Sequence, residues 1–186
     1  MSISLNEYLK NFAKERNGTF KVKKTAPGIG GMNSWRVTIL NLPYKNGEIH
    51  FIISQASPMK IHYIFNFNIK LDFLIYNEDW TDKIGKLFGL KEHQIGNNKF
   101  DNKFIIKGTN KTFVSNVLDK PIREFLIKNE RFSNLILESK TNNSKLELNA
   151  PFNESNTTKM KEAYEFIRHL ADNIYNFYEK QTDNKT

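Results

Sequence analysis

An unbroken alternation of side chains from Ile61 to Ile75 is the strongest constraint on what this chain can fold into. Every odd position is apolar or aromatic: Ile61, Tyr63, Phe65, Phe67, Ile69, Leu71, Phe73 and Ile75. Most even positions are polar, with Ile64 and Leu74 as exceptions. A period of two is typical of β-structure with one buried and one exposed face. We therefore expect either one bent strand or two strands separated near Asn68, and an apolar sheet face that needs a cover.

Shorter segments extend this pattern into an antiparallel meander between Asn17 and about Asn77. The Asn46-Gly47 pair predicts a tight hairpin. Short links favour strands that are consecutive in sequence becoming neighbours in the sheet. The other strands are expected at Thr19–Lys24, Trp35–Leu40, Glu48–Ser54 and Phe100–Lys107, with a second hairpin formed by Leu135–Glu138 and Lys145–Leu148.

Amphipathic helices are predicted at both ends of the chain. Ser4 and Glu7 form a capping box at the start of the first helix, and Asn17-Gly18 supplies its stop. A longer helix runs from Thr158 to about Tyr178, with apolar residues at spacings of three and four. Further helical segments are expected at Trp80–Leu90, Asn110–Leu118 and Lys120–Lys128, the last of them capped by Asp119.

These elements predict an α+β fold. An antiparallel β-meander packs against N- and C-terminal amphipathic helices, and a helix pair and a second hairpin occupy the C-terminal half. A chain of 186 residues, 39% of them hydrophobic, suits a single domain over residues 1–180. A soft division near residues 77–98 stays open as an alternative, and residues 181–186 are expected to form a disordered tail.

Composition narrows the class of protein. The sequence has no run of about eighteen apolar residues, so we expect no membrane span. Its first residues lack the basic and apolar regions of a secretory signal, which favours a cytoplasmic location. The absence of Cys excludes disulfides and thiolate metal sites.

The net charge of +8 raises the hypothesis of a nucleic-acid partner. Only five of the 28 basic residues are Arg, whose planar fork fits phosphates and base edges better than Lys does. The excess of Lys, Asn and Ile is also typical of AT-rich codons. The densest basic region, formed by Lys10, Lys14, Arg16, Lys21, Lys23 and Lys24, has its aromatic neighbours pointing inward and therefore offers no stacking platform. We interpret the charge mainly as a solvated surface.

The stretch from Lys83 to Lys128 carries an ordered set of motifs. A short Gly-containing helix precedes Phe-Asp-x-x-Phe and an apolar strand, followed by a Gly turn, a helix ending in Leu and an Ile-Arg-x-x-Leu helix. The residues are Gly85, Leu87, Phe100, Asp101, Phe104, Gly108, Phe113, Leu118, Ile122, Arg123 and Leu126. This order resembles a bacterial family of uncharacterised proteins, although residues 97–99 lack the acidic residue expected before the Phe-Asp pair. The resemblance implies an autonomous bacterial domain and no particular reaction. We expect Asp101 to cap a neighbouring turn or to pair with Lys103.

Three residues form the only metal constellation that the predicted strands favour. His50 and His62 lie on consecutive strands, opposite the most apolar positions, and Asp72 would share their face one strand further on. Two His and one carboxylate can bind a divalent metal. Solvated or hydrogen-bonded His side chains are the simpler interpretation. His93 and His169 have no partner that the sequence identifies.

Other candidate motifs have structural interpretations that fit better. The segment Pro27–Gly31 resembles a phosphate loop, but a strand rather than a helix follows it. The acidic cluster Glu78, Asp79 and Asp82 suits the start of a helix. Ser34 and Ser54 lack the strained turn of a catalytic nucleophile. We therefore assign no catalytic, cofactor-binding or metal residue, and expect no cofactor.

The function that these patterns favour is a non-enzymatic binding module, bacterial in origin. It would recognise a protein partner through the even-numbered sheet face or the Gly-rich loop, with an immunity- or inhibitor-like role as one form. A basic nucleic-acid-associated protein is the alternative, and a small metal-dependent hydrolase using His50, His62 and Asp72 is the third hypothesis.

Overall fold

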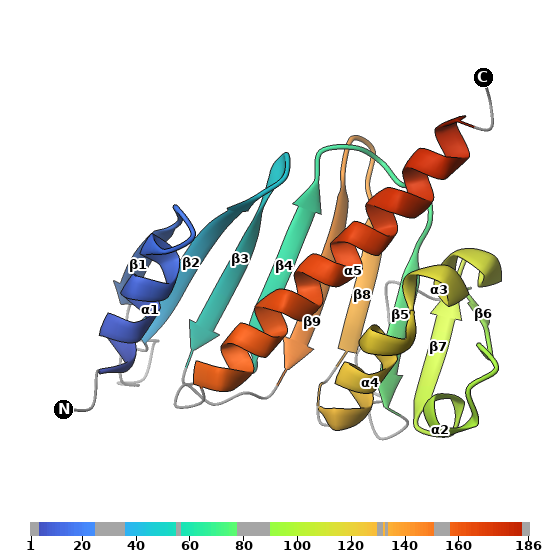
Figure 1. Ribbon diagram of the computed structural model, residues 1–186, viewed down its shortest axis with the longest axis horizontal. Coiled ribbons are helices and arrows are strands. Elements are labelled where there is room, and N and C mark those ends of the chain that lie inside the picture. The colour runs from blue at the N-terminus through green and yellow to red at the C-terminus, as the bar shows by residue number, and fades with distance from the viewer. Residues whose placement is uncertain are drawn as a thin grey trace, which may run out of the picture.

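The fold is built on one nine-stranded antiparallel sheet (Figure 1). A computed structural model describes residues 4–24, 36–54, 57–77, 90–129, 132, 134–150 and 157–183. The strand order across the sheet is β1-β2-β3-β4-β9-β8-β5-β7-β6. The strands are β1 (Thr19–Lys24), β2 (Arg36–Tyr44), β3 (Gly47–Ser54), β4 (Met59–Phe65), β5 (Phe73–Asn77), β6 (Lys91–Glu92), β7 (Phe104–Gly108), β8 (Asn134–Ser139) and β9 (Ser144–Ala150).

The long alternating segment is two strands, and they are not neighbours. β4 ends at Phe65 and β5 begins at Phe73. Between them Lys70 has a φ of 58°, which regular strands exclude. The hairpin β8–β9 lies between β4 and β5, so the meander is confirmed for β1 to β4, and the expectation that the fifth strand would join it directly is wrong.

Helices cover the apolar face that the alternation predicted. The helices are α1 (Leu5–Lys14), α2 (Asn98–Asp101), α3 (Lys111–Val117), α4 (Lys120–Lys128) and α5 (Thr157–Asp183). Helices α1, α3, α4 and α5 lie on one face of the sheet, and α5 crosses it diagonally (Figure 1). Among the described residues, none of the helices combines the length and the apolar character needed to cross a lipid bilayer.

The core lies between this face and the helices. Strand β4 illustrates it, since Ile61, Tyr63 and Phe65 are each fully buried, whereas Ile64 on the opposite face is 38% exposed. From α5, Ile167, Leu170 and Ile174 close the core from above and are fully buried. The prediction that the odd-numbered face packs against the terminal helices is therefore confirmed.

A buried tyrosine network fastens α5 to the sheet. The Tyr63 and Tyr175 hydroxyls are 2.9 Å apart, and the Tyr63 hydroxyl also donates to the Tyr44 carbonyl at 3.2 Å. The Tyr44 hydroxyl donates to Asp172 of α5 at 2.5 Å. Burial, followed by this hydrogen bond to a carboxylate, raises the pKa of Tyr44 to about 12. Tyr44 therefore stays protonated at neutral pH.

The local turn and cap signals are largely confirmed. Ser4 accepts a hydrogen bond from the Glu7 amide at 3.3 Å. The predicted first hairpin forms, although its loop is Lys45 and Asn46, and Gly47 already pairs with Tyr44. A side chain at Gly18 could not fit, because its Cβ would lie 2.5 Å from the Asn41 carbonyl oxygen.

Two predicted elements differ from the structure, and a third lies almost wholly outside the described residues. Phe100 belongs to the one-turn helix α2 rather than to a strand, because Asp101 binds the amides of the preceding turn. Strand β2 extends to Tyr44, beyond the predicted end at Leu40, while Trp35 lies outside the described residues. The predicted helix Trp80–Leu90 also lies outside them, except for Leu90, which is not helical.

Candidate functional site

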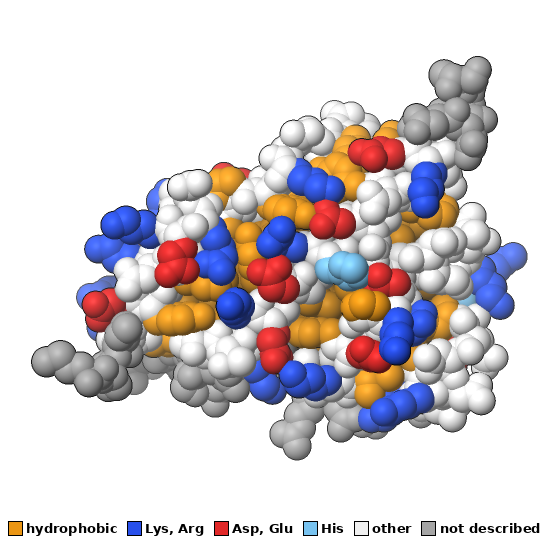
Figure 2. Space-filling model, in the orientation of Figure 1, with side chains coloured by type: hydrophobic (Ala, Val, Ile, Leu, Met, Phe, Trp, Pro, Cys, Tyr) orange, Lys and Arg blue, Asp and Glu red, His pale blue; other side chains and the backbone are white. Residues whose placement is uncertain are grey.

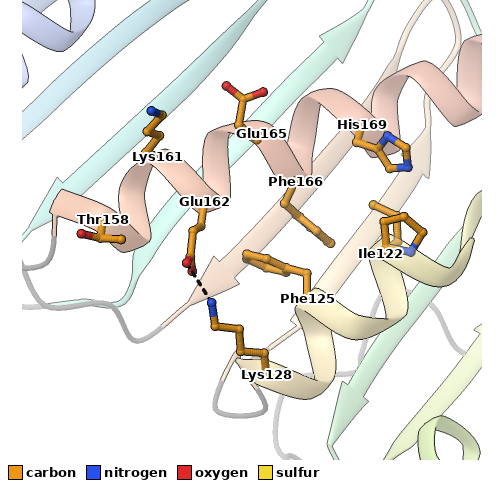
Figure 3. Close-up of a pocket in the computed structure, with 10 residues that line it drawn as sticks. Ile122, Phe125, Lys128, Thr158, Lys161, Glu162, Glu165, Phe166 and His169 are labelled. Atoms are coloured by element: carbon orange, nitrogen blue, oxygen red, sulfur yellow. Dashed lines mark hydrogen bonds and ion pairs between the residues drawn. The ribbon is translucent and has the colours of Figure 1, made fainter.

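An apolar groove lies between α4 and α5 (Figure 3). Its volume is about 490 Å³, within the range of about 300–1,000 Å³ usual for ligand pockets. Pro121, Ile122, Phe125 and Phe166 form its apolar floor, and Lys128, Thr158, Lys161, Glu162, Glu165 and His169 form its rim.

The start of α4 is fixed to α5 by one carboxylate. Asp119 caps α4 by accepting a hydrogen bond from the Ile122 amide at 3.1 Å. Its other oxygen lies 2.6 Å from Nε2 of His169 on α5. Partial burial works to raise the pKa of Asp119, but the hydrogen bonds from His169 and Ile122 outweigh it and lower the pKa. A predicted helix cap thus also sets the distance between the two walls of the groove.

The floor of the groove is a stacked aromatic pair. The rings of Phe125 and Phe166 are 4.2 Å apart between centroids and inclined by 22°. Phe166 is 4% exposed, whereas Phe125 is only half-buried and turns part of its ring toward the groove. Half-buried aromatic rings in concave sites are frequent anchors for binding partners.

The rim carries charges of both signs. Lys128 of α4 and Glu162 of α5 form an ion pair of 2.8 Å that bridges the groove (Figure 3). Glu165 pairs with Arg168 at 3.0 Å. Figure 2 shows apolar side chains between charged ones on this face of the molecule. The two Lys and two Glu of the lining balance, so the groove itself favours an uncharged apolar group.

The opposite sheet face carries a polar row across four strands. His50 and His62 are direct cross-strand partners, and their rings stack with centroids 4.8 Å apart. Asn41 extends the row on β2, with its Oδ1 2.9 Å from Nδ1 of His50. Glu147 of β9 lies opposite His62 on the other side. The prediction that the two histidines approach across the strands is confirmed.

His62 is held neutral by its surroundings. Burial, followed by the positive charges of Lys145 and His50, lowers its pKa to about 4. Its Nδ1 is buried without a hydrogen-bond partner. Glu147 pairs with Lys145 and accepts from the Asn149 amide group, and these bonds lower its pKa despite its burial.

The predicted third member of the metal constellation lies elsewhere. Asp72 stands in the link between β4 and β5, where it accepts a hydrogen bond from the Ser139 amide at 2.6 Å. The expectation that it lies one strand further on from His62 is wrong, because β9 rather than β5 is the next strand. The described residues contain no group of three or more His, Cys, Asp or Glu side chains placed to hold a metal ion.

The remaining candidate residues are dispersed. His93 lies 2.9 Å from the Gly108 carbonyl, and Asp101 accepts from the amides of Ile95, Gly96 and Asn97, which confirms its capping role. Ser54 ends β3. The candidates outside the described residues are the Gly-rich segment Pro27–Gly31, Ser34 and the acidic cluster Glu78, Asp79 and Asp82.

The densest basic region is divided between the two faces of the sheet. Lys21 and Lys23 lie on the face opposite the helices, at the edge strand β1. Arg16 follows α1, where its guanidinium lies 3.8 Å from the centre of the Phe12 ring and pairs with Glu15. These charges do not form one continuous track.

Comparison with known proteins finds a similarity of fold. No protein-family model and no curated protein sequence matches the chain. The crystal structure of the mycobacterial trehalose monomycolate transport factor A, TtfA, is similar, with a TM-score of 0.61 and 10% sequence identity. The similarity covers 91% of this chain and 94% of that chain. At this identity the two proteins share an architecture over nearly their whole length.

Proposed function

We propose that this chain is a non-enzymatic interaction module that binds a protein partner in the α4–α5 groove. The observation that carries the proposal is the half-buried Phe125 ring, stacked on Phe166 at the floor of a hollow of about 490 Å³. An apolar anchor of a partner, such as one side of an amphipathic helix, would cover this ring. Exposed aromatic floors with polar rims are typical of binding sites.

The similarity of fold is consistent with a binding role. The mycobacterial protein is named for the transport of trehalose monomycolate rather than for a reaction. An immunity- or inhibitor-like protein of bacterial, cytoplasmic origin remains one form that this function could take. The nucleic-acid alternative has less support, because the densest basic region is split between two faces. The hydrolase hypothesis loses Asp72 as its carboxylate.

The test compares capture by the unchanged chain with capture by variants of one ring. Phe125→Glu places a charge at the apolar floor, and Phe125→Leu keeps the floor apolar. Ile64→Glu is the matched control, because Ile64 is 38% exposed on the opposite face. Thermal unfolding of each variant shows whether the fold is retained.

The expected result is a partner protein that binds the unchanged chain, Phe125→Leu and Ile64→Glu but not Phe125→Glu. The partner must then bind the purified chain in titration calorimetry with the same order of affinities. A partner that binds Phe125→Glu as tightly as the unchanged chain contradicts the groove as the site. Loss with Ile64→Glu alone would move the site to the open face of the sheet.

A further inference from the structure

A second hollow, of about 480 Å³, lies on the other side of α4. Its lining contains four cations and one carboxylate, in contrast to the balanced rim of the α4–α5 groove. The residues that line it are Asn97, Lys99, Lys120, Arg123, Glu124, Ile127 and Lys128. We call it the cationic hollow.

Lys128 is paired with Glu162, but the charge of the other three cations of the cationic hollow is only weakly compensated. Lys120 and Glu124 are 3.8 Å apart and both largely exposed, so their pairing is weak. Within the described residues neither Lys99 nor Arg123 forms an ion pair with a carboxylate. The carboxylate of Asp101, the acid of α2, is engaged by three backbone amides of the preceding turn.

One of these cations is held in place. Arg123 Nη1 donates to the Leu118 carbonyl at 2.6 Å, at the junction between α3 and α4. A guanidinium fixed in this way loses little side-chain entropy when its remaining donors bind an oxyanion. Lys99 and Lys120 are exposed and can turn toward the same anion.

The cationic hollow and the α4–α5 groove meet at Lys128, which lines both. Helix α4 is therefore a ridge with an apolar groove on one side and a cationic hollow on the other. Lys and Arg side chains lie beside α4 in Figure 2. A ligand that covered this ridge would need apolar and acidic groups side by side.

We propose that the cationic hollow binds the carboxylates of an acidic segment of the protein partner, next to the apolar anchor that enters the α4–α5 groove. This inference rests on the proposed function and specifies its partner. Charge complementarity carries it, since Lys99, Lys120 and Arg123 against Glu124 add two net positive charges beside a neutral groove. An acidic partner would also be steered toward a chain whose net charge is +8.

The experiment uses hexaglutamate peptide as the probe and the isotope-labelled full chain as the receptor. We expect amide shifts in residues 97–99 and 120–128, and binding that weakens as salt is added. The double variant Lys99→Glu, Lys120→Glu should lower the affinity about tenfold, because two exposed contacts become repulsive. The matched control, Lys21→Glu with Lys23→Glu, makes the same change of net charge on β1 and should retain binding.

Two results would overturn the inference. Equal losses in the double variant and its control would mean that the peptide responds only to net charge. Shifts at residues 97–99 and 120–128 with inorganic phosphate or a short single-stranded oligonucleotide, and none with hexaglutamate, would assign the hollow to phosphate instead.

The proposed function can be judged separately. Phe125→Glu should leave hexaglutamate binding at the hollow intact while it abolishes capture of the partner. A different result is a partner that needs Phe125 but binds the Lys99→Glu, Lys120→Glu variant with unchanged affinity. That result would support the groove as the binding site and contradict the binding of an acidic segment in the cationic hollow.

Discussion

The two faces of the sheet are made by alternate residues of the same strands, yet they differ in burial and in polarity. On β4, Ile61, Tyr63 and Phe65 face the helices and are fully buried, while His62 and Ile64 face away from them. The covered face is mainly apolar, and its few hydroxyls, such as those of Tyr63 and Tyr175, are hydrogen-bonded. The open face combines stacked histidines, ion pairs and half-exposed aliphatic groups. The burial that stabilises this fold is therefore concentrated on one side of a single sheet.

The largest expected effect comes from making the same substitution on both faces of β4. Ile61→Ala should lower the free energy of unfolding by about 2–5 kcal/mol, because a fully buried side chain leaves a cavity. Ile64→Ala should cost less than about 1 kcal/mol, since its side chain is 38% exposed and gains little from burial. Chemical denaturation of both variants measures the difference. Similar losses would show that the open face is covered in solution.

Acid should weaken the fold through the open face. The pKa of His62 is about 4 in the folded chain and about 6.5 as a free side chain, so the unfolded state binds more protons between these values. Stability should therefore be unaffected by His62 above pH 6.5 and fall as the pH drops toward 4. We expect a loss of about 1–2 kcal/mol, reduced from the full linkage value because solvent reaches part of the ring.

The pH experiment needs a variant that removes only the titratable group of His62. His62→Gln keeps a polar side chain beside His50, Lys60, Lys145 and Glu147, the charged and titratable groups that influence the pKa of His62. The difference in unfolding free energy between the native chain and His62→Gln should change between pH 6.5 and 4. A difference that is constant with pH would contradict a buried neutral histidine.

The smallest effect tests a polar atom on the covered face. Tyr63→Phe removes the hydroxyl that meets Tyr175 and the Tyr44 carbonyl, and should cost about 0.5–1.5 kcal/mol in unfolding free energy. Tyr8→Phe is a control, because its hydroxyl donates to the Thr157 carbonyl in a part-buried position at the rim of the core. Thermal unfolding should rank Tyr63→Phe as the more damaging of the two. The reverse order would mean that the hydrogen bonds of the Tyr63 hydroxyl contribute little to the free energy of unfolding.

The sequence predicted the elements of the sheet better than their arrangement. Alternation around Ile61 and Phe73 shows which side chains are buried, but it contains no information about which strand lies beside which. The link after Phe65 also alternates, but because its apolar side chains pack on other elements and not because it is a strand. Phe67 packs on Tyr178 with ring centroids 4.4 Å apart, and Ile69 is 5% exposed, although neither residue is in a strand. Tertiary packing thus produced the same two-residue alternation as a strand.

The candidate groove was missed because its signal is small. Phe125 and Phe166 each precede a fully buried residue of the helix stripe, Leu126 and Ile167. An aromatic residue one position off the stripe widens the apolar surface of a helix and indicates a second helix beside it. The pairing of α4 with α5 was not predictable from either helix alone. The cross-strand approach of His50 and His62 was predictable, because a hairpin of short links fixes which residues face each other.

The insertion of β8–β9 between β4 and β5 has a consequence for how the chain is made. During synthesis the first four strands emerge long before residues 144–150, which form β9. Until then β4 is an edge strand with unpaired backbone groups and an uncovered apolar face. β5 emerges early as well, but its partner β8 begins only at Asn134. Pairings this distant in sequence slow folding and prolong the lifetime of aggregation-prone intermediates. Chaperone demand should accordingly be greatest for nascent chains that end shortly before the second hairpin.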